Sequence, residues 1–144
     1  MRASHLSARS ASPELPRASH DVVETTTETF NARDFDRFAD MLADDVICRT
    51  PGGIVEKGKA ACVAFHRRWL ADFPDGHLEV RARHTIDHVV VEEGTFRGTH
   101  DGLAATGRSV CLDYVRVVEV NDGKQVSLNL TFDRLVMLEQ LGLV

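Results

Sequence analysis

The first half of the chain carries apolar residues at helical spacing. Positions three and four apart predict a helix that begins at Ser19 or His20, either of which could cap it. Its buried face is expected to hold Val22, Val23, Thr26 and Phe30. Asp34 suits the N-cap of a second, short helix. The apolar positions of that helix are Phe35, Phe38, Met41 and Leu42.

A short strand and a third helix are expected next. Val46–Cys48 predicts the strand, which the Pro51-Gly52-Gly53 run ends. The helix extends from Lys59 to Phe73, before the stop signal Pro74-Asp75-Gly76. One stripe of it holds Val63, His66, Trp69, Leu70 and Phe73.

The second half alternates apolar and polar residues, which is typical of strands. Asp122-Gly123 suits the central positions of a tight hairpin turn, where both residues need positive φ. A loop is expected over Asp101–Gly107 and an earlier turn near Ile86-Asp87. A C-terminal turn or short helix is expected to carry Leu135, Leu138 and Leu141. The predicted strands are Leu78–His84, His88–Thr99, Arg108–Val120 and Gln125–Phe132.

Helices followed by an antiparallel meander predict an α+β fold with the helices on one face of the sheet. Three helices on a bent sheet can leave a conical hollow. The chain has 144 residues, which fits one domain over residues 20–144. Residues 1–19 are rich in Ser and Arg and are expected to form a disordered tail.

Composition narrows the function. The net charge is −5 and no basic cluster is present, which argues against nucleic-acid binding. Three widely spaced cysteines without a CxxC pair indicate a reducing compartment, and we expect a cytoplasmic protein. No apolar run is long enough for a membrane span. His84 and His88 lie on predicted strand without a completing carboxylate cluster, so no metal is expected, and no nucleotide-binding motif suggests a cofactor.

The last hairpin has a polar face. Counting from the Asp122-Gly123 turn puts Tyr114 opposite Thr131, Leu112 opposite Asp133 and Arg116 opposite Asn129. Asp133 would then share a face with Tyr114, Thr131 and Asn129. This face is either the solvated side of the sheet or the lining of the hollow, with the apolar face covered by a second subunit.

Several ordered motifs together resemble the SnoaL-like polyketide cyclase family, within the nuclear-transport-factor-like superfamily of α+β cones. The resemblance covers about Asp21 to Val144. Its motifs are Asn31-Ala32-Arg33-Asp34-Phe35, Gly98-Thr99-His100-Asp101-Gly102, Thr106-Gly107-Arg108, Asn121-Asp122-Gly123-Lys124, Asp133 and Leu138-Glu139-Gln140-Leu141-Gly142.

The resemblance implies an enzyme without a cofactor that closes a ring by an intramolecular aldol reaction on a polyketide or a similar apolar, oxygenated molecule. Asp133 matches the family's acid/base, and the resemblance also implies homodimers formed through the sheet. The expected pocket residues around Asp133 are Tyr114, Thr131, Asn129, Leu112, His66, Trp69, His100 and Phe38.

Two of these side chains have a simpler interpretation as well. His66 either faces the hollow or is a hydrogen-bonded core residue, and His100 either joins the site or structures its loop. For Trp69 we expect a place in the core or cavity wall. The alternatives to a cyclase are a hydroxylase component, an epoxide hydrolase or isomerase on the same fold, and a binding module without chemistry.

Overall fold

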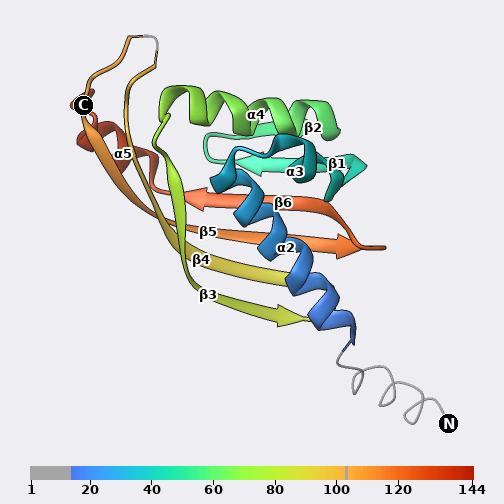
Figure 1. Ribbon diagram of the computed structural model, residues 1–144. Coiled ribbons are helices and arrows are strands. Elements are labelled where there is room, and N and C mark those ends of the chain that lie inside the picture. Colours follow the sequence, from blue (N-terminus) through green and yellow to red (C-terminus); the bar gives the residue numbers. More distant parts are fainter. Residues whose placement is uncertain (1–13, 103) are drawn as a thin grey trace, which may run out of the picture.

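The structure is a computed structural model that describes residues 14–144 except residue 103. Its helices cover one face of a curled sheet that does not close into a barrel (Figure 1). The helices are α2 (Glu14–Ala32), α3 (Phe35–Asp40), α4 (Lys59–Asp72) and α5 (Arg134–Gln140). The strands are β1 (Leu42–Thr50), β2 (Ile54–Lys57), β3 (His77–Ile86), β4 (Val89–Thr99), β5 (Ser109–Asn121) and β6 (Lys124–Phe132). The predicted α+β class is confirmed.

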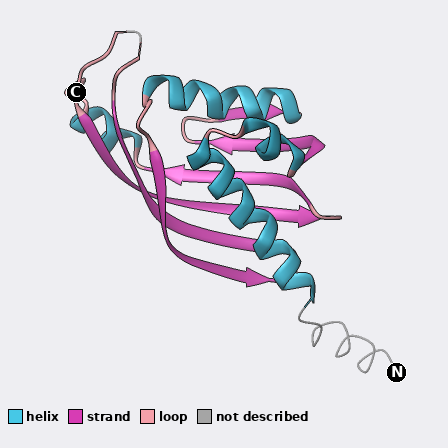
Figure 2. Ribbon diagram, in the orientation of Figure 1, coloured by secondary structure: helices cyan, strands magenta, loops and turns pink. Residues whose placement is uncertain are grey.

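The sheet has the strand order β2-β1-β6-β5-β4-β3. Only the β1–β6 pair is parallel among the described strands, and the other pairs are antiparallel. Helices α2, α3 and α4 lie along the concave face, while α5 lies at the strongly curled end (Figure 2). The sheet and its helices therefore enclose a tapering interior.

Three local expectations are corrected. Helix α2 begins at Glu14, so Ser19 is a buried residue inside the helix rather than its cap, and residues 14–19 are helical rather than a tail. The expected tail otherwise lies outside the described residues. Helix α3 ends at Asp40, because Leu42 already pairs with β6. The positive φ of Gly52 and Gly53 lets the chain reverse, which adds strand β2.

The predicted hairpin turn is present, but the register beyond it differs from the count. Asp122 and Gly123 have φ of 51° and 72°, as the tight turn requires. A bulge then shifts the β5–β6 pairing between Glu119 and Val120, because Val126 adds one residue to β6. Tyr114 consequently pairs with Phe132 rather than Thr131. A one-residue shift exchanges the two faces of a strand, so the expected grouping of Tyr114 with the polar face of β6 is wrong.

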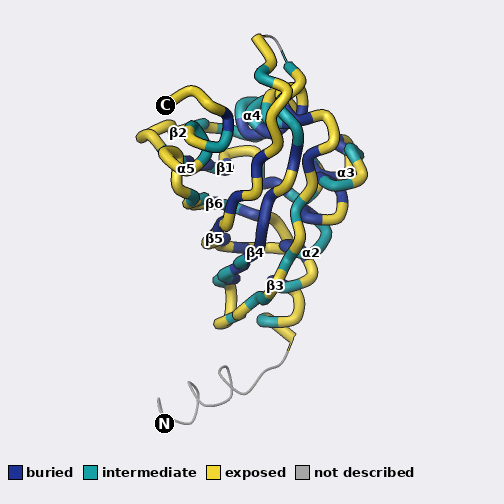
Figure 3. The backbone as a smooth tube through the Cα atoms, turned by 90° about the vertical axis from the view of Figure 1, so that its left-hand side faces the viewer, coloured by how far each residue is buried: buried dark blue, intermediate teal, exposed yellow. Residues whose placement is uncertain are grey.

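The hydrophobic core lies between the concave face and the helices, and the buried stretches of β4 and β5 are visible in Figure 3. Residues of β5 alternate strictly between buried and exposed, so Leu112, Tyr114 and Arg116 point inward. Among the described residues, no helix is both long enough and apolar enough to cross a membrane. Cys48 and Cys62 are buried free thiols, and Cys111 is exposed.

Candidate active site

A cavity lies inside the cone, between the helices and the inner face of the sheet. Its volume is about 60 Å³. Most of its surface is apolar. The lining residues are Thr26, Phe30, Phe38, Phe65, His66, Trp69, Leu78, Phe96, Leu112, Tyr114, Arg116, Leu128, Leu130 and Phe132.

The polar groups of the cavity lie at its buried end. Thr26, His66, Tyr114 and Arg116 are all buried. The lining residues that keep some exposure are apolar, and they mark the side nearer to solvent: Phe65, Trp69, Leu78, Leu130 and Phe132. A ligand would therefore meet hydrogen-bonding groups at its inner end and aromatic and aliphatic walls around the rest.

His66 extends from α4 into this apolar surrounding. Its Nδ1 lies 2.7 Å from the carbonyl oxygen of Cys62. Because a carbonyl oxygen can only accept, Nδ1 carries the hydrogen and Nε2 carries the lone pair of the neutral ring. Phe38 packs against the ring with centroids 4.8 Å apart. Within the described part of the chain, no hydrogen bond engages Nε2.

Burial lowers the pKa of His66 to about 4, and the nearby positive charge of Arg116 acts in the same direction. The hydrogen bond to Cys62 opposes this change, but it is the smaller effect. The ring is therefore neutral at pH 7. It offers a buried proton acceptor beside an apolar ligand space.

Beneath the cavity lies a carboxylate that is completely buried, Glu92 of β4. Its Oε1 accepts from the Tyr114 hydroxyl at 2.9 Å and from Nε of Arg116 at 2.8 Å. Its Oε2 accepts from Nε of Arg83 at 2.7 Å and from the Thr27 hydroxyl at 2.9 Å. Every lone-pair direction is thus occupied by a donor.

Burial alone would raise the pKa of Glu92. The charges and hydrogen bonds of Arg116 and Arg83 outweigh it and lower that pKa to about 2. Burial and the charge of Glu92 also raise the pKa of Tyr114 above its ordinary value. Glu92 is therefore an ionised, saturated anchor and is unsuited to act as a base, while Tyr114 keeps its proton.

Glu92 fixes the guanidinium of Arg116 at the cavity. Nη2 of Arg116 also donates to the hydroxyls of Thr26 and Thr27 and to the carbonyl oxygen of Val23. Nη1 makes no hydrogen bond to any described residue. The side chain of Arg116 is only 6% exposed, and it lines the cavity.

Asp133 does not line the cavity. It is exposed and caps α5, where its Oδ1 accepts from the backbone N–H groups of Leu135 at 2.9 Å and Val136 at 3.2 Å. Asn129 and Thr131 are exposed on the outer face of β6. The expected inward orientation of these three residues is corrected by the bulge that shifts the hairpin register. The solvated-face alternative describes them.

The remaining candidates divide in two. Tyr114, Leu112, His66, Trp69 and Phe38 meet at the cavity. His100 does not line it.

Instead, Nδ1 of His100 accepts from the backbone N–H of Thr106 at 3.1 Å, and the ring packs against Phe73. These contacts hold the loop after β4 in place. His100 therefore structures this loop rather than the cavity.

Sequence reasoning missed Glu92, and it placed Arg116 on the strand face of Tyr114 without naming it as a site residue. The alternation of β5 was a usable signal, because Arg116 has the same parity as Leu112 and Tyr114. A charged residue on an apolar strand face demands a buried partner, and Glu92 on the neighbouring strand supplies it.

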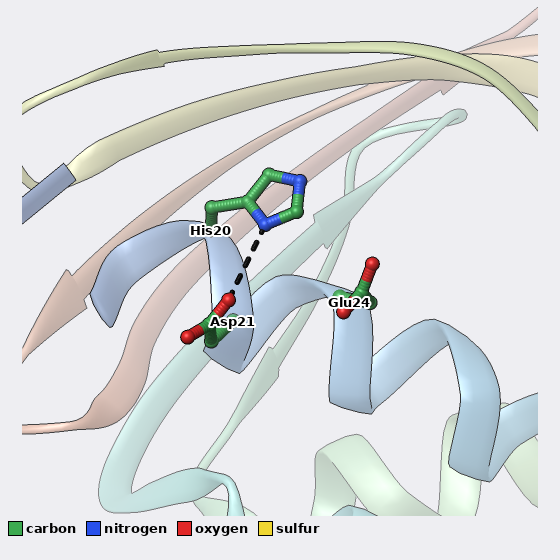
Figure 4. A group of neighbouring side chains, drawn as sticks. All are labelled: His20, Asp21 and Glu24. Atoms are coloured by element: carbon green, nitrogen blue, oxygen red, sulfur yellow. Dashed lines mark ion pairs between the residues drawn. The ribbon is translucent and has the colours of Figure 1, made fainter. Parts of the chain in front are cut away.

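One cluster of possible metal ligands lies on α2, away from the cavity: His20, Asp21 and Glu24 (Figure 4). Their ligand atoms lie within 4.8 Å of one another. Nδ1 of His20 is 3.5 Å from Asp21, and Glu24 pairs with Arg83. The cluster is solvated and partly engaged in ion pairs, so we assign it no metal.

The fold resembles several solved structures. A candidate SnoaL-like polyketide cyclase from Jannaschia sp. CCS1 has a TM-score of 0.83 at 18% identity, over 90% of this chain and 94% of that one. IdmH, a candidate polyketide cyclase from Streptomyces antibioticus, has a TM-score of 0.77 at 24% identity, over 86% and 98%. An LEH-like epoxide hydrolase from M. tuberculosis has a TM-score of 0.76 at 21% identity, over 90% and 92%.

No curated protein matches the sequence. The family model of SnoaL-like polyketide cyclase matches residues 20–141, which is most of the chain and agrees with the motifs found in the sequence. The chain therefore belongs to the SnoaL-like polyketide cyclase family.

Proposed function

We propose that this protein is a cyclase that closes a ring by an intramolecular aldol-type reaction on a small, apolar, oxygenated substrate, with His66 as the base. One observation carries the proposal: a neutral histidine presents its free Nε2 lone pair at the polar end of an apolar cavity. The family of the chain supports the reaction type.

The reaction would proceed in two steps. Nε2 of His66 takes a proton from a carbon beside a carbonyl, and the electron pair of that C–H bond moves into an enolate. The enolate carbon then attacks a second carbonyl of the same molecule, which forms a C–C bond and an alkoxide. The alkoxide recovers the proton from His66, so the enzyme is regenerated without a cofactor. The half-buried Trp69 and Phe132 on the outer side of the cavity would fold the part of the substrate that extends beyond it, so that the two carbons meet.

An epoxide hydrolase is less well supported. Opening an epoxide with water generally uses carboxylates to position and activate the water. Among the described residues, no Asp or Glu lines the cavity. Glu92 lies behind Arg116 and Tyr114, and all its acceptor positions are filled.

A short triketone, nonane-2,4,8-trione, tests the proposal. Its acidic carbon between two carbonyls can attack the distant ketone to form a six-membered ring. His66→Gln keeps a polar side chain but removes the base, and should slow ring closure by about 10²-fold or more. The rate is measured by chromatography of the product against a reaction without protein.

Asp133→Asn is the matched comparison, because the family resemblance makes Asp133 the acid/base. The proposal requires that this variant retain most of the wild-type rate. If Asp133→Asn abolishes ring closure and His66→Gln closes the ring at the wild-type rate, Asp133 is the base and the proposed role of His66 is rejected.

We also propose that two copies associate through the outer face of the sheet. Val115 and Val117 of β5 are 38% and 37% exposed there, beside half-buried residues of β4. Apolar strand residues in water favour burial against a partner. In size-exclusion chromatography the wild type should elute as a dimer and a Val117→Glu variant as a monomer. If the wild type also elutes as a monomer, the interface is rejected.

A further inference from the structure

Arg116 has an unused donor at the cavity. Its Nε and Nη2 are held by Glu92 and by groups of α2, whereas Nη1 has no hydrogen-bond partner among the described residues. The residue is 5% exposed. Nη1 is not among the described side-chain atoms that are sealed from solvent without a partner, so it reaches the accessible space of the cavity and can donate to a ligand acceptor there.

The charges behind the cavity favour a negative ligand atom. Two guanidinium groups, Arg116 and Arg83, contact the one buried carboxylate, Glu92. The second acidic partner, Glu24, lies at 3.5 Å from Arg83 on the surface and is 45% exposed. Water screens that outer charge more than the inner ones. The buried end therefore keeps an excess of positive charge.

The same field reaches His66, because Arg116 contributes to lowering the pKa of the imidazole. A base with a pKa of about 4 removes protons efficiently only from a carbon acid that is itself comparatively strong. An ordinary ketone is a far weaker acid than a 1,3-dicarbonyl compound. The proton acceptor and the positive charge thus select for the same kind of head group.

The volume of the cavity limits what reaches the polar end. It measures about 60 Å³, less than half of the ~150 Å³ engineered cavity that admits benzene. A compact head group fits there only if the rest of the substrate extends past the half-buried Trp69 and Phe132.

We propose that the polar end of the cavity is an enolate-binding site, which takes the head group of a 1,3-dicarbonyl compound and places its oxygen anion against Nη1 of Arg116. This inference rests on the proposed function and names the residue that would bind the enolate oxygen. Arg116 would stabilise the negative charge that forms as the proton leaves. Glu92 would act as a positioning residue, because it holds the guanidinium in place without contacting the ligand.

The test uses 2,4-pentanedione with excess wild-type protein. The ultraviolet absorbance of its enolate is followed across pH, and fluorescence of Trp69, the only tryptophan, reports occupancy. An opposite charge in hydrogen-bond contact favours the ionised form by about 1–3 pH units. The enolate midpoint should therefore fall by at least about one unit. 2-Pentanone, of similar size but without the acidic carbon, should bind at least tenfold more weakly at pH 8.

Two variants distinguish a direct contact with Arg116 from the effect of the positive charge of the buried region as a whole. Arg116→Gln alone would leave Glu92 poorly compensated, so it is combined with Glu92→Gln, which leaves the net charge of the buried region unchanged. The double variant should lose the downward shift of the midpoint. Arg83→Gln removes the other cation but leaves Nη1 of Arg116 in place, and it should retain most of the shift. The opposite pattern overturns the assignment to Arg116.

The wild-type titration decides the matter even if the double variant does not fold. The enolate site is overturned if Trp69 fluorescence reports binding but the midpoint of the enolate titration does not shift. It is also overturned if the diketone does not bind at all. The proposed function fails separately, when His66→Gln closes the triketone ring at the wild-type rate. A shifted midpoint without ring closure would therefore keep the enolate site and reject the cyclase.

Discussion

Nδ1 of His66 lies 2.7 Å from the carbonyl oxygen of Cys62, one helical turn earlier in α4. This one contact decides which ring nitrogen carries the hydrogen, because a carbonyl cannot donate. It also fixes the ring, since Cys62 itself is completely buried. The lone pair of Nε2 is therefore directed away from the helix that bears it. His66 is therefore a hydrogen-bonded core residue that also lines the cavity.

The low pKa of His66 makes stability depend on pH. In the unfolded chain the imidazole binds a proton below about pH 6.5, but in the folded protein it does so only below about pH 4. Between these values the unfolded state holds more protons, so stability falls as the pH falls from 6.5 to 4. The loss should be on the order of 3 kcal/mol. Urea denaturation at pH 7, 5.5 and 4 measures it.

His66→Gln provides the control for this loss, because it cannot titrate. The variant should lose less stability than the wild type between pH 6.5 and 4. Equal losses in both proteins would assign the effect to other groups. Glu92 contributes at lower pH, since its stabilisation is present above about pH 4.5 and disappears as the pH approaches 2.

Replacing Glu92 by Gln should destabilise the protein strongly. The substitution keeps the shape of the side chain but leaves Arg116 and Arg83 without their buried counter-charge. Breaking a buried ion pair by removing one partner costs about 3–5 kcal/mol. Urea denaturation at pH 7 measures the change in free energy of unfolding.

Glu93→Gln is the matched control, because Glu93 is the next residue of β4 and lies on the outer face. It should change stability by less than about 0.5 kcal/mol. A Glu92→Gln variant that is as stable as Glu93→Gln would mean that the two arginines are hydrated rather than paired.

The element order and the helix faces could be predicted because they depend on local periodicity. Val22, Val23, Thr26 and Phe30 are buried on α2 as their spacing indicated. The Asp122-Gly123 turn could be predicted for the same reason, since its φ values suit few other residues.

The expected site residues of β6 and Asp133 were harder to place, because their orientation depends on one residue, Val126. A hairpin register counted from the turn is correct only while no bulge intervenes, and no simple sequence signal marks a bulge. Once Val126 shifted the register, Asp133 moved from the expected lining to the surface. The ion pair of Glu92 with Arg116 joins strands β4 and β5. It could not be predicted from the residues around either one, because it depends on how the two strands pair.

Asp133 should contribute to stability through its cap. Replacing it by Ala removes the acceptor for the N–H groups of Leu135 and Val136, which typically costs about 0.5–2 kcal/mol. Asp133→Ser retains an acceptor of similar reach and should lose less. Denaturant unfolding of the two variants makes the comparison, and equal stability of Asp133→Ala and wild type would show that the cap is unimportant.

Gly94 makes room for the hydroxyl of Tyr114. A Cβ atom on Gly94 would lie 2.9 Å from the Tyr114 hydroxyl oxygen and 2.4 Å from the carbonyl oxygen of Glu79. Both distances are too short, so Gly94→Ala should cost about 1–3 kcal/mol and push Tyr114 away from Glu92. Urea denaturation measures the loss.

The same substitution in a Tyr114→Phe background identifies which contact matters. Removing the hydroxyl relieves the 2.9 Å contact with the added methyl group and leaves the 3.0 Å contact with Cε1 of the ring, so the double variant should lose less stability than the sum of the two single losses. Strict additivity would show that the hydroxyl adds nothing to the cost of Gly94→Ala. The contacts with the carbonyl oxygen of Glu79 and with Cε1 of the ring would then account for it, and the glycine would not serve the placement of the hydroxyl.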